Sequence, residues 1–139
     1  MWIASSAHYF LPFKPSYPYY GEVIFPNKLP EIISHFAGFD GVHYLRLAKD
    51  GYVTDFTQAF FPLYPLLIKL ISPLFFSNFI LTALIISNIS FLVLIFLFYS
   101  LVKKIKGEKV ALWSAIFLIL FPTSFYFVSV YTESLFLLL

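Results

Sequence analysis

The sequence contains no cysteine, and this absence removes several kinds of chemistry at once. Disulfide bonds, thiolate metal sites and cysteine nucleophiles all require a residue that the chain lacks. Charged residues are also scarce, since they make up 12% of the 139 residues, whereas soluble domains have about a quarter. The net charge of +2 is small, and the basic residues form no stripe with spaced aromatics, so nucleic acid is not an expected partner.

Two further signatures are missing. The chain has no glycine-rich loop of the kind that binds nucleotide phosphates, and no cofactor is expected. No residue is predicted as a metal ligand, although a divalent metal is left open. The first ten residues, MWIASSAHYF, have neither the basic n-region nor the apolar h-region of a signal peptide. Membrane targeting would then depend on an internal hydrophobic span or on sequence beyond this chain.

Long apolar runs dominate what remains. Hydrophobic residues make up 60% of the chain, and residues 70–102 and 110–132 contain no charged side chain. Both runs exceed the roughly 20 residues that cross a bilayer core of about 30 Å. The sequence therefore predicts an all-α, polytopic integral membrane protein, with transmembrane helices at 79–102 and 110–131. A further transmembrane helix is expected to begin at 132–139.

The segments before the first predicted span are aromatic and rich in proline. Residues 1–58 are predicted to form an extracytoplasmic loop at the membrane–water interface, where amphipathic aromatic rings are favoured. Within this loop, 38–50 lacks proline, and we expect a short interfacial helix that stops near Gly51. Residues 59–76 are apolar but interrupted by prolines and by Lys69, which favours a re-entrant or interfacial helix over a full span.

The turn at 103–109, KKIKGEK, sets the predicted orientation. Lysine and arginine collect in short cytoplasmic loops, so this turn is expected on the cytoplasmic side. Asp40 and Glu133 would then both face the extracytoplasmic or lumenal side. The membrane would be the cytoplasmic membrane in a prokaryote and the endoplasmic reticulum in a eukaryote.

The densest cluster of charge lies in FDGVHYLRLAKDGY, residues 39–52. On a helix, Asp40, His43 and Tyr44 share one face. Asp40 also lies near the start of the predicted helix, where the helix dipole stabilises a carboxylate. The stretch is therefore a candidate site at the outer surface.

Three segments resemble the PIG-V mannosyltransferases and their prokaryotic relatives. In order, they are FDGVHYLRLAKDGY at 39–52, AFFPLYPLL at 59–67 and FPTSFYFVSVYTESLFLLL at 121–139. The resemblance covers residues 39–139 and lies in the order and spacing of the three segments, rather than in any one of them. The family often has tryptophan where this chain has Phe39.

The resemblance implies a glycosyltransferase of the GT-C class. Such enzymes have more membrane spans than this chain holds, so the chain is expected to be a fragment of a larger polytopic protein. They transfer a hexose, here expected to be mannose, from a polyprenyl-phosphate donor to a hydroxyl group of a lipid-linked glycan or glycolipid. Membrane lipid, the donor and the acceptor are the expected partners. The family has an essential acidic residue in its first outer loop, and Asp40 matches that position.

A phosphate-linked donor already carries a good leaving group, so an inverting transfer needs a single base. Asp40 is the predicted catalytic base. The departing phosphate needs cations or hydrogen-bond donors, and His43 and Arg46 are the predicted candidates. The other predicted substrate-binding residues are Tyr44, Tyr131 and Glu133.

Each assignment has a structural alternative. Asp40 can be only a helix-start carboxylate, and His43 can be a hydrogen-bonding residue of the fold. Arg46 can pair with Asp50 one helical turn later or contact lipid headgroups. Tyr131 can be an interfacial anchor.

Two other functions are open at this point. A non-catalytic membrane protein that binds or translocates a lipid-linked sugar would need the aromatic interface and the re-entrant segment, but not Asp40. A structural fragment, or the product of a pseudogene, would need none of these three features. Hydrophobic spans encoded upstream and downstream of this chain would favour the enzyme.

Overall fold

The structure, a computed structural model, describes residues 19–24, 30–53 and 57–139. Every regular element in these ranges is a helix, which confirms the predicted all-α class. The elements in chain order are α2 (Tyr20–Val23), α3 (Glu31–Ser34), η2 (His35–Ala37), α4 (Asp40–Asp50), η3 (Thr57–Ala59), α5 (Leu63–Ile71), η4 (Ser72–Phe75), α6 (Phe79–Lys106), α7 (Glu108–Leu120), α8 (Phe125–Val128) and α9 (Glu133–Leu138). Parts of the predicted aromatic loop over 1–58, namely 1–18, 25–29 and 54–56, lie outside the described residues.

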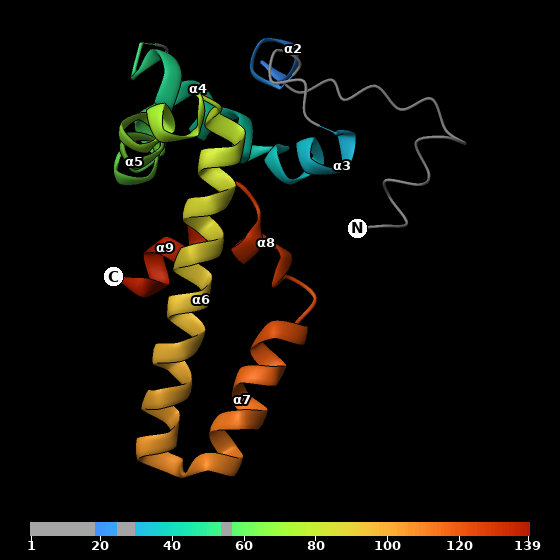
Figure 1. The fold of residues 1–139 in the computed structure, drawn as a ribbon, viewed down its shortest axis with the longest axis vertical. Coiled ribbons are helices and arrows are strands. Elements are labelled where there is room, and N and C mark those ends of the chain that lie inside the picture. The colour runs from blue at the N-terminus through green and yellow to red at the C-terminus, as the bar shows by residue number, and fades with distance from the viewer. Residues whose placement is uncertain (1–18, 25–29, 54–56) are drawn as a thin grey trace, which may run out of the picture.

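Helix α6 is the long axis around which the other elements are arranged (Figure 1). It begins where the Asn78 side chain accepts a hydrogen bond from the Leu81 N–H at 3.0 Å, a common N-cap. It ends at Lys106 and is capped by Gly107, whose φ of 88° is readily adopted by glycine. Its 28 residues rise about 42 Å, enough to cross a bilayer. Within the described residues, α6 is the one helix that is long and apolar enough to do so.

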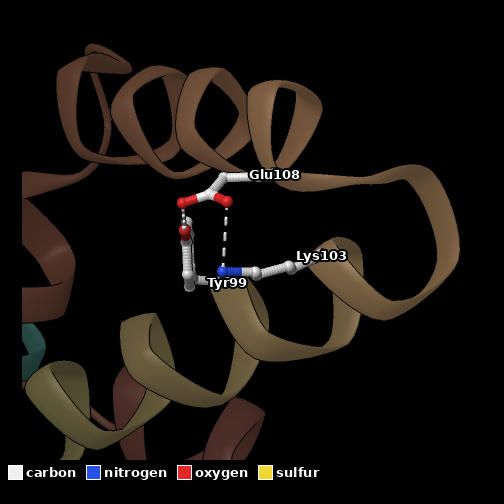
Figure 2. A network of polar contacts seen from close by, with 3 residues as sticks. All are labelled: Tyr99, Lys103 and Glu108. Carbon is white, nitrogen blue, oxygen red and sulfur yellow. Dashed lines mark hydrogen bonds and ion pairs between the residues drawn. The ribbon is translucent and has the colours of Figure 1, made fainter.

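Helices α6 and α7 form an antiparallel hairpin with Gly107 at the turn (Figure 1). Figure 2 shows the polar contacts at this turn: Lys103 Nζ lies 3.3 Å from Glu108 Oε2, and the Tyr99 hydroxyl donates to Glu108 Oε1 at 3.4 Å. Because these groups are exposed, they contribute little to stability. The lysine-rich turn lies at the far end of α6 from α4 and α5 (Figure 1).

The second predicted span, 110–131, is not one continuous helix. Helix α7 ends at Leu120, and Phe121 is extended (φ −62°, ψ 138°), as the residue before a proline prefers to be. Pro122 lacks an N–H and so cannot extend the helix through this point. After a short turn, the chain continues as α8 and α9, which pack against α6.

Helices α4 and α5 pack against the first half of α6 and form the main core with it. Helix α5 tolerates Pro65 because the N–H groups of the first turn have no partner within the helix. Apolar side chains that are almost completely buried come from all three helices and from the segment between α8 and α9: Val42, Leu45, Tyr64, Ile68, Ile80 and Val130. The segment before α9 is therefore part of the core and not a surface loop.

Candidate active site

Helix α4 begins at Asp40, and the residue before it has an unusual backbone conformation. Phe39 has a φ of 52° and a ψ of −121°, which residues with a side chain rarely adopt. Such conformations cost about 1–3 kcal/mol and persist where surrounding contacts determine them. Here the strained residue places the Asp40 carboxylate in the first turn of α4.

Gly41 allows α4 to approach the backbone of Val130 closely. A Cβ atom at position 41 would lie 3.1 Å from the Val130 carbonyl oxygen and 3.3 Å from the Val130 Cβ. The Val130 N–H donates to the Phe36 carbonyl at 2.9 Å. The Tyr131 hydroxyl donates to the Gly38 carbonyl at 3.3 Å. These contacts join the start of α4 to the segment that leads into α9.

An open cleft of about 430 Å³ lies where these segments meet. It is lined by Phe39, Asp40, Tyr126, Tyr131 and Glu133. The cleft therefore brings together three of the predicted site residues, two of them carboxylates. Glu133 Oε2 is buried and has no hydrogen-bond partner among the described residues. A buried oxygen without a donor costs free energy, and a bound hydroxyl group would remove that cost.

Tyr44 lies next to the cleft without lining it. Its hydroxyl is 3.3 Å from Thr132 Oγ1, and its ring packs edge-on against that of Tyr64, with centroids 5.4 Å apart. Burial raises the pKa of the Tyr44 phenol, the hydrogen bond to Thr132 lowers it, and the carboxylates of Glu133 and Asp40 raise it. Tyr44 is therefore a neutral hydrogen-bonding group beside both carboxylates.

His43 and Arg46 lie against an aromatic cluster outside the cleft. The His43 ring stacks on Phe60, with centroids 5.1 Å apart, and meets the edge of Tyr19 at 5.9 Å. The Arg46 guanidinium carbon is 3.5 Å from the centroid of the Tyr19 ring. Its Nε is 3.9 Å from Asp50 Oδ2, the i,i+4 pair that the sequence offers as an alternative. The structure thus does not bring either side chain into the cleft with the two carboxylates.

Phe39 and Tyr126 line the cleft although the sequence reasoning predicts neither as a site residue, and Tyr126 is the one that it does not mention at all. Its ring meets the edge of Tyr131, with centroids 5.0 Å apart. In a chain with 22% aromatic residues, one more tyrosine looks like an interfacial anchor. Its place in the third family-like segment, five residues before Tyr131, is the signal that could have identified it.

The cleft has the chemical groups that bind a sugar. Carboxylates accept hydrogen bonds from hydroxyl groups, and aromatic rings offer apolar surface to the ring of a ligand. In the ranges that the structure describes, no three His, Asp or Glu side chains come together as metal ligands would. The two carboxylates, Asp40 and Glu133, are therefore the groups in this cleft that could contact a cation.

Comparison with known proteins adds one finding. A family model described as mannosyltransferase (PIG-V) matches residues 22–139. The matched range includes every residue that lines the cleft. No curated protein and no solved structure matches the chain.

Proposed function

The chain belongs to the mannosyltransferase (PIG-V) family, and we propose that it carries the cleft in which mannose is transferred from a polyprenyl-phosphate donor. The acceptor is a hydroxyl group of a lipid-linked glycan or glycolipid. Family membership supports mannose transfer as the reaction, and the apolar helix α6 supports a membrane location. We also propose the polytopic GT-C architecture. The proposed reaction requires no cofactor.

The observation that carries the proposal is the pairing of Asp40 and Glu133 in one aromatic-walled cleft. Residues far apart in the sequence meet there through two hydrogen bonds and the close contact at Gly41. A carboxylate used only to start a helix would not require a second carboxylate beside it. Glu133, whose Oε2 has no hydrogen-bond partner among the described residues, is in turn the proposed acceptor for a sugar hydroxyl.

In the proposed reaction, Asp40 is the base. The acceptor oxygen bonds to the anomeric carbon of mannose while the bond from that carbon to the phosphate oxygen breaks. The electron pair of the broken bond leaves with the phosphate, and the hydroxyl proton passes to the Asp40 carboxylate. Because attack and departure take place on opposite faces of the sugar, its configuration inverts. Glu133 and Tyr131 bind the sugar, and Tyr44 supports them.

We assign the phosphate of the donor to Arg46 and His43. Arg46 Nη1 is buried and has no hydrogen-bond partner among the described residues, so it can donate to an anion. Arg46 follows Asp40 by six residues, about 9 Å along α4, which separates the phosphate end of a donor from its sugar end. Positive charge at this position would stabilise the departing phosphate.

Replacement of Asp40 tests the proposal. Asp40→Asn keeps the shape of the side chain and removes its basicity, so transfer should fall by about 10²–10⁴-fold, as is typical when a general base is lost. Donor binding should change little, because the lipid and phosphate contacts remain. The measurement is mannose transfer from polyprenyl-phosphate mannose in membranes that carry the protein.

Asp50→Asn is the matched control. Asp50 is an exposed partner of Arg46 at 3.9 Å on the same helix, so its loss should cost far less transfer. Near-normal transfer by Asp40→Asn, with normal binding of the donor, would favour a protein that only binds or translocates the lipid-linked sugar. Equal losses in both variants would assign Asp40 a structural role in α4.

A further inference from the structure

The second family-like segment, AFFPLYPLL, lines no part of the cleft, so the proposed chemistry leaves it without a role. Its Tyr64 is nevertheless 1% exposed and is one of the largest fully buried side chains among the described residues. The Tyr64 hydroxyl donates to two acceptors of α6, Ser87 Oγ at 2.7 Å and the Ala83 carbonyl oxygen at 3.0 Å. A buried hydroxyl with two polar contacts indicates a specific structural task.

Ser87 connects this tyrosine to the backbone around Glu133. Ser87 Oγ donates to the Tyr131 carbonyl at 3.1 Å. The Ser134 hydroxyl donates to the Ser87 carbonyl at 3.0 Å. Ser87 and Ser134 are completely buried. The two hydrogen bonds thus hold the chain on both sides of Glu133, whose carboxylate lines the cleft.

The direction of the Ser87 hydroxyl is unusual for this helix. Thr82 and Ser100 donate to the carbonyl four residues earlier, at 2.7 and 2.8 Å, which is the ordinary choice of a helical hydroxyl. The corresponding carbonyl for Ser87 belongs to Ala83, and it accepts from Tyr64. Ser87 donates to another segment instead. Tyr64 therefore occupies the acceptor that Ser87 would otherwise use.

We propose that Tyr64 is a positioning residue for Glu133. Its hydroxyl proton lies between Ser87 Oγ and the Ala83 carbonyl oxygen, so Ser87 accepts from Tyr64 and directs its own proton to the Tyr131 carbonyl, which fixes the backbone that leads into α9. The effect on catalysis rests on the proposed function, in which Glu133 binds the sugar. The positioning of the backbone by Tyr64 and Ser87 does not depend on that function. The segment AFFPLYPLL then positions a residue of the site without contacting the substrate.

Removal of one hydroxyl tests this arrangement. Tyr64→Phe keeps the ring and its edge contact with Tyr44, so the core remains filled. The Ser87 hydroxyl should return to the Ala83 carbonyl, and the Tyr131 carbonyl should lose its donor. The kcat for mannose transfer should then fall about 10- to 100-fold, as small misplacements of binding groups do, with the donor KM changed less than about threefold.

Tyr99→Phe is the matched control, because it removes a tyrosine hydroxyl from the same structure at the opposite end of α6 (Figure 2). Its kcat and KM should equal those of the unmodified protein. An unchanged kcat in Tyr64→Phe, or an equal fall in both variants, would overturn the proposal.

A second measurement does not depend on activity. The chain has no cysteine, and a Cβ at Gly41 would lie 3.3 Å from the Val130 Cβ, close to the separation of about 3.5–4.5 Å in disulfides. A Gly41→Cys/Val130→Cys variant in membranes should therefore form a disulfide on mild oxidation, detected by loss of thiol alkylation. Adding Tyr64→Phe should slow its formation at least about fivefold, because the segment before α9 is released.

Disulfide formation at the same rate with and without the Tyr64 hydroxyl would overturn the proposal, whatever the activity. Absence of the disulfide when Tyr64 is intact would do so too, since the contact that the hydroxyl is inferred to hold would not exist. If the unmodified protein transferred no mannose while the disulfide formed and depended on Tyr64, the proposed function would fail and the positioning of the segment would stand.

Discussion

Gly41 allows the start of α4, with Asp40, to lie close to the backbone of Val130, three residues before Glu133. It lies in the first turn of α4, where alanine would favour the helix by about 1 kcal/mol. Gly51 and Gly107 have positive φ values, of 81° and 88°, and thus a conformational reason to be glycine. The reason at Gly41 is space, because a Cβ would lie 3.1 Å from the Val130 carbonyl oxygen. The Val130 carbonyl oxygen is a backbone atom and cannot rotate away as the end of a side chain could.

Gly41→Ala should therefore lower mannose transfer despite its better helix propensity. The added methyl group must push α4 from Val130 by a few tenths of an ångström and so widen the cleft between Asp40 and Glu133. We expect transfer to fall about tenfold or more, in proportion to the misplacement of the reacting groups. Lys49→Ala, an exposed change on the same helix, should stay within about twofold. Full activity of Gly41→Ala in the membrane assay would show that this contact does not set the cleft.

Rare charged residues of the site can be identified from the sequence, whereas the neighbours that surround each side chain cannot. Asp40 and Glu133 stand out because charge is rare in an apolar chain and costly to bury. His43 and Arg46 lie on α4 as well, but helical periodicity cannot tell which neighbours cover them. Their contacts with Tyr19 follow from the tertiary packing of a distant aromatic residue.

Helix boundaries show the same division between local and tertiary signals. The start of α6 follows from Asn78, a capping residue placed directly before an apolar run. The end of α7 is less evident, since residues 110–132 contain no charged side chain. Hydropathy measures the polarity of side chains and therefore does not show where the backbone leaves the helical conformation. Pro122 suggests a kink, whereas the structure has a complete break between Leu120 and α8. After that break, α8 and α9 pack against α6, and their residues Tyr126 and Glu133 line the cleft.

The N-cap of α6 provides a prediction for a whole element. Asn78→Ala removes the acceptor of the Leu81 N–H and should destabilise the protein by about 1 kcal/mol, whereas Asn78→Ser should retain most of the stability. The measurement is the thermal denaturation midpoint of the purified protein in detergent, in which the alanine variant should denature a few degrees earlier. Identical midpoints for the alanine and serine variants would show that another donor or water replaces the cap.

Charges of opposite sign gather in two separate regions of the molecule, lysines at one end of α6 and the cleft carboxylates toward the other. Four lysines lie where α6 meets α7, namely Lys103, Lys104 and Lys106 in the last turn of α6 and Lys109 in the first turn of α7, while the cleft with Asp40 and Glu133 is formed near α4. Ser87, which holds the backbone on both sides of Glu133, precedes Lys103 and Lys106 by 16 and 19 residues, about 24–28 Å along α6 and close to the roughly 30 Å of a bilayer core. If α6 crosses the membrane, the cleft and the lysines therefore lie on opposite sides.

Labelling of single cysteines tests this orientation in a chain that has none of its own. Lys106 lies in the lysine-rich turn, and Lys49 is an exposed residue of α4. Because lysines of short loops are retained on the cytoplasmic side, Lys106→Cys should be protected from a membrane-impermeant thiol reagent in intact cells and labelled after permeabilisation. Lys49→Cys should be labelled in intact cells of a prokaryotic host, since α4 is proposed to lie at the outer surface. Labelling of Lys106→Cys before permeabilisation, or protection of Lys49→Cys, would invert the proposed sidedness and place the cleft away from an extracytoplasmic donor.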